Sequence, residues 1–257
     1  MILNTFDWLC LGVASFCAGF IDASVGGGGL IQLPAFIQIL PFTTSAQQVS
    51  TVKLSAFFGT CLAAIRYSRI VNFNKKTVFM CCTFGMIGSV IGAIAVSIVP
   101  SKIIRSVLPI VLSFILLYTY MNKNFGKLHA PKFSSKTIII ITCIFTIIIG
   151  FYDGFLGPGS GSLLLFSSIY FLGFDFLHAS AFSKIVNTAT NISALILFYE
   201  KKEILFSIGI FMGIINLFGS FLGTTIVIKK QIAFIRYAFL VVVLLLILRL
   251  IILEWFI

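Results

Sequence analysis

The stretch GFIDASVGGGG occupies residues 19–29, and a related stretch, GFYDGFLGPGSG, occupies residues 150–161. Each places an aspartate before a cluster of glycines inside otherwise apolar sequence. The offset along the chain from Asp22 to Asp153 is the same as the offset from Lys53 to Lys184. This repeat offset also relates GSVIG at residues 88–92 to GSFLG at residues 219–223. The ungapped register indicates an internal duplication, and duplicated halves with matching helix breaks are typical of transporters that bind their substrate between the repeats.

The composition indicates an integral membrane protein. Of the 257 residues, 60% are apolar and 10% are charged, and the mean hydropathy is +1.15. A soluble domain would carry about 25% charged residues. The net charge of +11 is concentrated in short connections between apolar runs, which favours cytoplasmic loops over a nucleic-acid partner. No basic residue precedes the first apolar run, so we expect that run to remain in the mature protein.

Each half is predicted to contain two helical runs separated by a glycine cluster, followed by three fuller spans. The first run, at 8–21 or 136–151, stops at the glycine cluster, and a short run at 30–40 or 162–172 follows. At a rise of about 1.5 Å per residue, the short runs cannot cross a bilayer alone. Each half therefore opens with a glycine-broken helix or a re-entrant hairpin, followed by three transmembrane helices. These are predicted at 47–67, 77–99 and 103–121, and at 179–199, 204–228 and 232–253.

The fold class is accordingly all-α, a polytopic membrane protein with two homologous repeats. The first repeat is predicted at 1–125, a polar cytoplasmic linker at 126–135 and the second repeat at 136–257. Inverted repeats place eleven Lys and Arg residues inside and four outside, whereas parallel repeats place ten inside and five outside. The positive-inside rule thus favours inversion by a small margin, with both termini outside. The paired glycines of residues 88–92 and 219–223 predict close helix packing.

The glycine clusters are candidates for an anion-binding site. Unpaired backbone groups facing lipid cost several kcal/mol each, so the clusters must line a cavity or pack against protein. Amide groups at such a break, followed by a helix N-terminus, form a nest that binds anions. The predicted donors are Gly26, Gly27, Gly28 and Gly29 in the first half and Gly157, Gly159, Ser160 and Ser162 in the second. The alternative is close helix packing.

Lys53 and Lys184 are the strongest single candidates for substrate binding. A lysine inside a transmembrane helix costs about 2.5–3.5 kcal/mol to insert and usually faces a water-filled path or a partner. The alternative is that each side chain extends to the membrane surface. Recurrence in both halves, close to polar residues such as Asn187, favours the functional interpretation. Two converging ammonium groups would select an anion.

Asp22 and Asp153 precede the two breaks and are candidates for proton coupling. A carboxylate removed from water binds a proton more readily, and intramembrane carboxylates often relay protons in transporters. The alternatives are capping of free N–H groups or pairing with the lysine of either repeat. The six cysteines have no ligand-like spacing to His129 or His178, so no disulfide, metal or cofactor is expected.

At these motifs the chain resembles the sulfite exporter TauE/SafE family of membrane transporters. The resemblance is carried by residues 19–34 and, with greater specificity, by residues 150–162. One difference is Val52, because the family usually has Ala-Thr-Asn-Lys where this chain has Ser-Thr-Val-Lys at 50–53. The resemblance implies ATP-independent transport of sulfite, an organosulfonate or a related anion. Consistent with this, Leu30 and Ile31 follow the glycines where a nucleotide-binding loop would have Lys and Ser or Thr.

The prediction is a multi-pass secondary transporter of the cytoplasmic (inner) membrane that moves a small anion by alternating access. Its expected partners are that anion and the lipid bilayer, and a homodimer is left open. A passive anion channel and a carrier of small carboxylates are the alternatives. An enzyme is not expected, because no serine, histidine and acid are arranged as a catalytic set.

Overall fold

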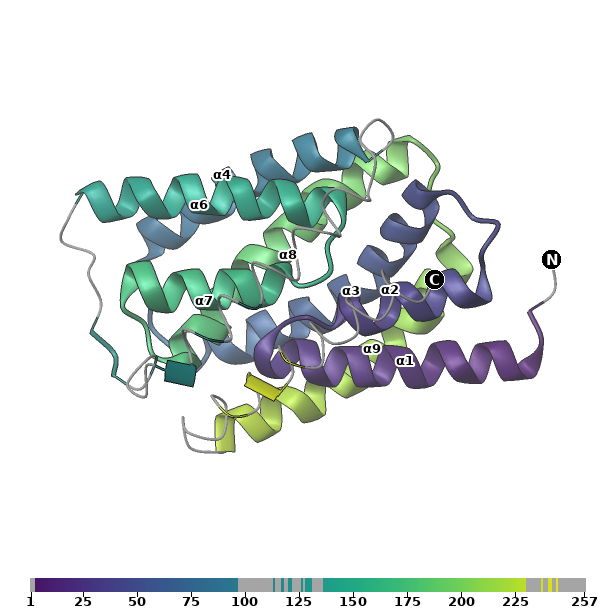
Figure 1. Cartoon of the computed structure of the whole chain (residues 1–257), viewed down its shortest axis with the longest axis horizontal. Helices are drawn as coiled ribbons and strands as arrows, with labels where there is room; N and C mark the ends of the chain where they lie inside the picture. The colour runs from purple at the N-terminus through teal and green to yellow at the C-terminus, as the bar shows by residue number, and fades with distance from the viewer. Residues whose placement is uncertain are drawn as a thin grey trace.

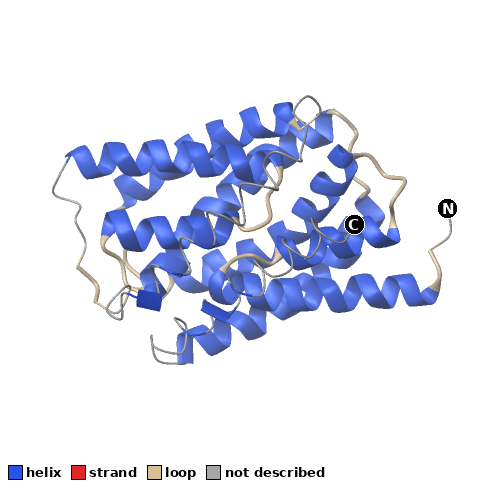
Figure 2. Cartoon of the chain, in the orientation of Figure 1, coloured by secondary structure: helices blue, strands red, loops and turns tan. Residues whose placement is uncertain are grey.

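The computed structural model describes residues 3–96, 126, 128–130 and 136–229, with single positions inside 113–121 and 237–244. The predicted spans at 103–121 and 232–253 and part of the predicted linker lie outside these residues. All regular secondary structure in the described part is helical (Figure 2). The helices are α1 (Thr5–Val25), α2 (Gly29–Ile39), α3 (Ser45–Ser68), α4 (Lys75–Ala95), α6 (Lys136–Phe155), α7 (Ser160–Leu172), α8 (Phe176–Glu200) and α9 (Phe206–Lys229).

Five of these helices, α1, α3, α4, α8 and α9, are long and apolar enough to cross a membrane. They contain 21 to 25 residues, which corresponds to about 30 Å or more along the helix axis. The two short helices, α2 and α7, contain 11 and 13 residues. These lengths confirm the prediction of an all-α, multi-pass membrane protein.

Polar caps set the beginnings of several helices, and they explain why these helices begin earlier than predicted. Asn4 caps α1 by accepting a hydrogen bond from the Asp7 backbone, and Asp7 accepts one from the Asn4 backbone in return. Asp175 caps α8 by accepting from the His178 backbone. From the apolar pattern, these helices were predicted to start at residues 8 and 179. With their caps, α1 begins at residue 5 and α8 at residue 176.

Each half opens with a hairpin, because the short helix turns back along the helix before it. In the first hairpin, the Gln32 amide of α2 donates a hydrogen bond of 2.9 Å to the Ser15 hydroxyl of α1. In the second, the rings of Phe171 on α7 and Phe145 on α6 lie 4.9 Å apart. Of the two forms that the sequence left open, the structure has the hairpin.

Glycines allow α4 and α6 to pack backbone to backbone (Figure 1). A Cβ on Gly88 would collide with the Ile147 carbonyl, and one on Gly92 would collide with the Phe151 carbonyl. Contacts advance along both helices in the same direction, so α4 and α6 run parallel. The predicted packing role of these glycines is confirmed.

Helices α1 and α9 pack in the same way on the opposite side of the bundle (Figure 1). Gly219 faces the Phe16 carbonyl and Gly223 faces the Phe20 carbonyl. These two helices also run parallel. Gly219 and Gly223 lie one repeat offset after Gly88 and Gly92, and their partners Phe16 and Phe20 lie one repeat offset before Ile147 and Phe151. The two helix pairs therefore make equivalent contacts.

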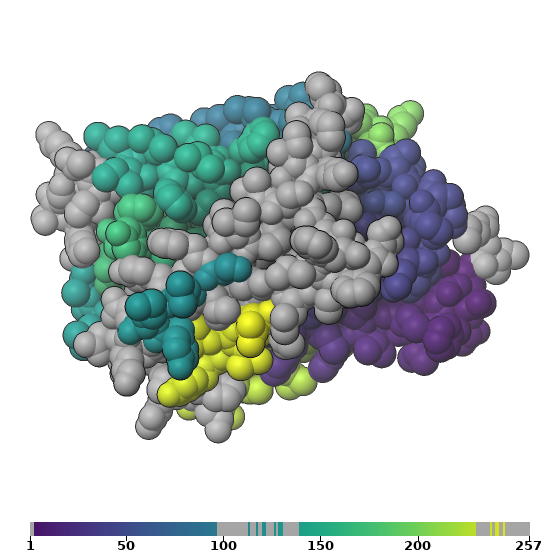
Figure 3. Space-filling model, viewed as in Figure 1, coloured from purple at the N-terminus to yellow at the C-terminus, as the bar shows by residue number. Residues whose placement is uncertain are grey.

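Helices α3 and α8 form the centre of the bundle. Helix α3 runs parallel to α9, because Ser50 contacts Glu203 near their beginnings and Arg66 contacts Thr224 near their ends. Helix α8 packs against α4 through the hydrogen bond from Ser89 to the Thr190 carbonyl. At the surface, α1 and the α2–α3 region occupy one end of the molecule and α6 the other (Figure 3).

Candidate functional site

Two ion pairs join the halves of the chain inside the bundle. The Lys53 ammonium on α3 lies 2.9 Å from an Asp153 carboxylate oxygen on α6. The Lys184 ammonium on α8 lies 2.7 Å from an Asp22 carboxylate oxygen on α1. The lysine of each half therefore pairs with the aspartate of the other half. Between 1% and 15% of each side chain is exposed, and pairing is what makes such buried charges tolerable.

The Lys53–Asp153 pair is embedded in a network of neutral polar groups. Lys53 also donates to the Asn191 amide oxygen at 3.1 Å, and the second oxygen of Asp153 accepts from the Ser160 hydroxyl at 2.6 Å. The Asn191 amide nitrogen donates in turn to the Asn187 side chain at 3.1 Å. The network fixes both charged groups and leaves three uncharged side chains next to them.

The Lys184–Asp22 pair uses the first glycine cluster. One Asp22 oxygen accepts from Lys184, and the other accepts from the Gly28 backbone N–H at 3.3 Å, at the beginning of α2. The Gly26 N–H donates to the Asp22 carbonyl at 2.9 Å. Two amides of the predicted anion-binding nest are therefore bound by Asp22 itself. Its carboxylate occupies a place suited to a bound anion, between an ammonium group and a helix N-terminus.

The two glycine breaks contact each other. Gly26 and Gly157 both have a φ of 85°, a conformation that favours glycine. A Cβ on Gly26 would collide with the backbone of Gly161 and Ser162. The Ser162 hydroxyl donates to the Val25 carbonyl at 3.3 Å, at the end of α1. Each break thus covers part of the other break's backbone, as a polar backbone at membrane depth requires.

A cavity of about 40 Å³ lies where the ion pairs and the breaks meet. A cavity needs about 10–15 Å³ of such volume to hold one water, so this cavity has room for a few water molecules. Its lining includes Val49, Val52 and Lys53, which are all on α3. Lys184 is not in its lining, so the cavity belongs mainly to the Lys53 side of the site.

The structure brings most of the predicted site residues to this cavity. Those that line it are Asp22, Gly27, Gly29, Lys53, Asp153, Gly157, Gly159, Ser160 and Asn187. Four others lie behind the lining: Gly26 against the second break, Gly28 against α1, Ser162 on the Val25 carbonyl, and Lys184 on Asp22.

Two polar lining residues, Asn191 and Thr60, were not predicted as site residues. They lie at equivalent positions of the two halves, and the Asn191 amide is 3.5 Å from the Thr60 hydroxyl. Each lies seven residues after the lysine of its half, about two helical turns further on and on the same face. That spacing was a usable signal.

The part of the chain that the structure describes has five helices long and apolar enough to cross a bilayer, which is characteristic of polytopic membrane proteins. The profile of the family described as sulfite exporter TauE/SafE matches residues 11–250. This chain belongs to that family.

Several relatives are named as probable membrane transporter proteins. A Sinorhizobium protein, ORF9, is 34% identical over 214 residues, covering 83% of this chain and 79% of that protein. A Haemophilus influenzae protein is 30% identical over 227 residues, covering 88% and 86%. The Escherichia coli K12 protein YfcA is 31% identical over 239 residues, covering 89% and 84%. No solved structure matches this chain.

Proposed function

We propose that this chain is a secondary transporter of a small anion, built from two inverted repeats in the cytoplasmic membrane. The crossed lysine–aspartate pairs are the observation that carries the proposal. Each pair takes its lysine from one half and its aspartate from the other, so both halves are needed to complete either anion site. Binding at the interface of two repeats is the arrangement that alternating access uses.

Helix directions support inversion of the repeats. Helices joined by short connections, such as α3 to α4 and α8 to α9, run in opposite directions across the bundle. Because α3 runs parallel to α9, it runs opposite to α8, its equivalent in the second half. Likewise α1 runs parallel to α9 and α6 runs parallel to α4, so α1 and α6 are also opposed. Parallel repeats would give equivalent helices the same direction.

Charge at the two ends supports an orientation in the membrane. The end formed by the α3–α4 connection, the start of α6 and the end of α9 carries Arg69, Lys75, Lys76, Lys136 and Lys229. The opposite end carries Lys201 and Lys202 together with the acidic residues Asp7, Glu200 and Glu203. The positive-inside rule assigns the first end to the cytoplasm and the N-terminus to the outside.

The two carboxylates occupy the positions that substrate oxygens would take. Asp153 accepts from Lys53 and Ser160, and Asp22 accepts from Lys184 and the Gly28 N–H. An anion that binds either lysine must displace a carboxylate. The displaced carboxylate would then remain buried without its partner, which costs several kcal/mol unless it takes up a proton.

Proton coupling follows from this balance of charge. Two lysines and two aspartates sum to zero, so an added monovalent anion leaves the site with one negative charge. Protonation of Asp153 or Asp22 restores neutrality and releases the lysine to the substrate. The expected transport cycle is therefore electroneutral, with one proton moving in the same direction as each negative charge on the anion.

The size of the cavity supports alternating access over a continuous pore. The cavity of about 40 Å³ is small and is lined by paired charges, and the hairpins that meet at the glycine breaks are the elements whose separation would widen it. The family description names sulfite, and on that basis we propose sulfite, an organosulfonate or a related sulfur oxyanion as the substrate. A small carboxylate has the same charge and similar acceptor oxygens.

Flux measurements in proteoliposomes test the proposal. We expect an imposed sulfoacetate gradient to drive saturable uptake, to acidify the lumen, and to proceed at the same rate when the membrane potential is clamped at zero. Asp153→Asn should abolish lumen acidification, whereas Glu200→Gln, which changes an exposed carboxylate, should leave it intact.

Three results would contradict the proposal: flux that follows the membrane potential, flux without proton movement, or acidification that persists in Asp153→Asn and Asp22→Asn alike. A passive channel would also show no counterflow, because labelled anion would not accumulate against unlabelled anion on the other side.

A further inference from the structure

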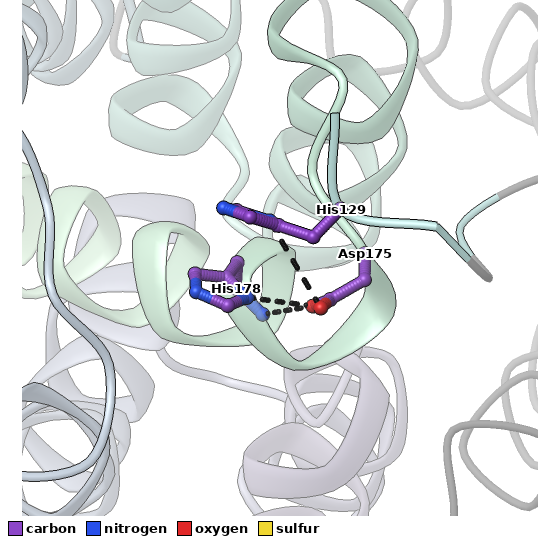
Figure 4. Close-up of side chains that lie close together, drawn as sticks. All are labelled: His129, Asp175 and His178. Carbon is purple, nitrogen blue, oxygen red and sulfur yellow. Dashed lines mark hydrogen bonds and ion pairs between the residues drawn. The ribbon is translucent and has the colours of Figure 1, made fainter. Parts of the chain in front are cut away.

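Three side chains with metal-ligand chemistry meet where α7 connects to α8. His129 comes from the predicted linker, Asp175 is the N-cap of α8, and His178 lies in the first turn of α8 (Figure 4). One ligand atom from each residue lies within 4.8 Å of the others. The Nδ1 atom of His178 is 2.9 Å from one Asp175 oxygen, and that of His129 is 3.9 Å from the other.

The folding of this corner brings His129 to the other two residues, although it is far from them in sequence. The Ala130 N–H donates to the Gly173 carbonyl, and the Phe176 N–H donates to the Gly126 carbonyl, both at 2.9 Å. These hydrogen bonds attach the predicted linker to both sides of the corner. The position of His129 is therefore determined by the fold.

Helix capping explains only part of this cluster. Asp175 accepts from the backbone and the ring of His178, which accounts for these two residues as a cap. It does not account for His129, whose ring stacks on that of His178 with a centroid separation of 3.6 Å. The His129 ring also stacks on that of Phe174, with a centroid separation of 5.6 Å, and its Nδ1 atom lies beyond hydrogen-bond distance of Asp175.

We propose that His129, Asp175 and His178 form a binding site for a divalent transition-metal ion such as Zn²⁺ or Ni²⁺. Two imidazoles and one carboxylate suit these ions, whereas Mg²⁺ and Ca²⁺ prefer oxygen ligands throughout. In a tetrahedral zinc site with bonds of about 2.0–2.1 Å, the ligand atoms lie about 3.3 Å apart. The distances from the Asp175 oxygens to Nδ1 of His178, 2.9 Å, and to Nδ1 of His129, 3.9 Å, bracket that value.

The cluster supplies three protein ligands, and water would complete the coordination. The His129 side chain is 32% exposed and the His178 side chain 22%, so an ion reaches the site from solvent. Binding requires the His129 ring to turn out of its stacked position so that its nitrogen faces the ion. A residue on an exposed connection can make that rotation more easily than one inside a helix.

Metal binding can be tested on purified full-length protein because these are its two histidines. A histidine-free affinity tag in place of a polyhistidine tag leaves no other imidazole in the protein. We expect Zn²⁺ or Ni²⁺ at one hundred times its Kd to raise Tm by about 5 °C or more, reversibly with EDTA, and Mg²⁺ to have no effect. Cu²⁺ should give an electron paramagnetic resonance signal with coupling to imidazole nitrogen.

Variants assign the site. His129→Ala should weaken binding at least tenfold and remove one imidazole from the spectrum, while His129→Ala with His178→Ala should abolish both signals. Asp175→Asn retains a good helix cap but loses the charged ligand, so it should fold and bind less tightly. Cys17→Ala removes an exposed thiol and should leave the Tm shift unchanged.

A wild-type protein with no Tm shift and no nitrogen coupling would overturn the proposal, as would the same shift in the variant without histidines. Neither result depends on transport activity, so this inference and the proposed function stand or fall separately.

Discussion

Replacing Lys53 with methionine removes one charge of a buried pair and keeps most of the length of the side chain. Lys53 and Asp153 have exposed side-chain fractions of 5% and 3%, so the remaining carboxylate is shielded from bulk water. Breaking such a pair costs about 3–5 kcal/mol, because the remaining carboxylate stays buried and keeps only the hydrogen bond from the Ser160 hydroxyl. For a chain of this size, that corresponds to a fall in Tm of about 6–20 °C.

The double variant Lys53→Met with Asp153→Asn separates the ion pair from other effects. The amide introduced in place of the carboxylate is uncharged and still accepts from Ser160, so we expect a total loss of only about 1–2 kcal/mol. The double-mutant cycle should therefore give a coupling free energy of at least about 2 kcal/mol. Anion flux should be absent from Lys53→Met and from the double variant, because recovery of stability does not restore the ammonium group.

Thermal unfolding in detergent measures the stability, and proteoliposome uptake measures the flux. A double variant whose loss equals the sum of the single losses would refute the pairing, and normal flux in the double variant would refute the role of Lys53 in binding. The second pair offers a matched comparison. The Asp22 side chain is 15% exposed and also bonded to the Gly28 N–H, so Lys184→Met should cost less than Lys53→Met.

Three further predictions concern helix contacts and access. Gly88→Ala should cost about 1–3 kcal/mol in thermal unfolding because its methyl group meets the Ile147 backbone, whereas Gly12→Ala meets only a flexible side-chain end and should be nearly neutral. Tyr67→Phe should cost about 1–3 kcal/mol because it leaves the Ala23 carbonyl without its donor, and the exposed Tyr199→Phe should change stability by less than about 0.5 kcal/mol; equal costs would contradict this. In a variant without native cysteines, Lys201→Cys, at the exposed connection from α8 to α9, should react with a membrane-impermeant thiol reagent added outside, and reaction only from inside would reverse the assigned orientation.

The repeat offset was sufficient to predict most of the site. It identified both lysines, both aspartates and both glycine clusters before any fold was known, because a charge or a helix break inside apolar sequence is unusual enough to be informative. It did not predict which lysine meets which aspartate. Pairing Lys53 with Asp22 inside one half agrees with the sequence as well as pairing it with Asp153, and only the crossing of α3 with α6 settles the choice.

Other parts of the structure depend on geometry that has no local signal. Gly26 and Gly28 were predicted as substrate ligands, but their N–H groups bond to Asp22, since the chain must satisfy its own donors at a helix break. The cluster of His129 and Asp175 was invisible to spacing rules, because the hydrogen bonds between the linker and the α7–α8 corner bring the two residues together.

The cavity departs from the equivalence of the two halves, and this difference has a mechanistic meaning. Val49, Val52 and Lys53 line it, whereas Ser180, Ser183 and Lys184, their equivalents in the second half, do not. In a transporter with inverted repeats, the opposite state arises when the two halves exchange conformations. That state would open the Lys184 side toward the cytoplasm, through a path in which two serines replace two valines. Under the proposed mechanism, the opening on the Lys184 side would be the more polar of the two.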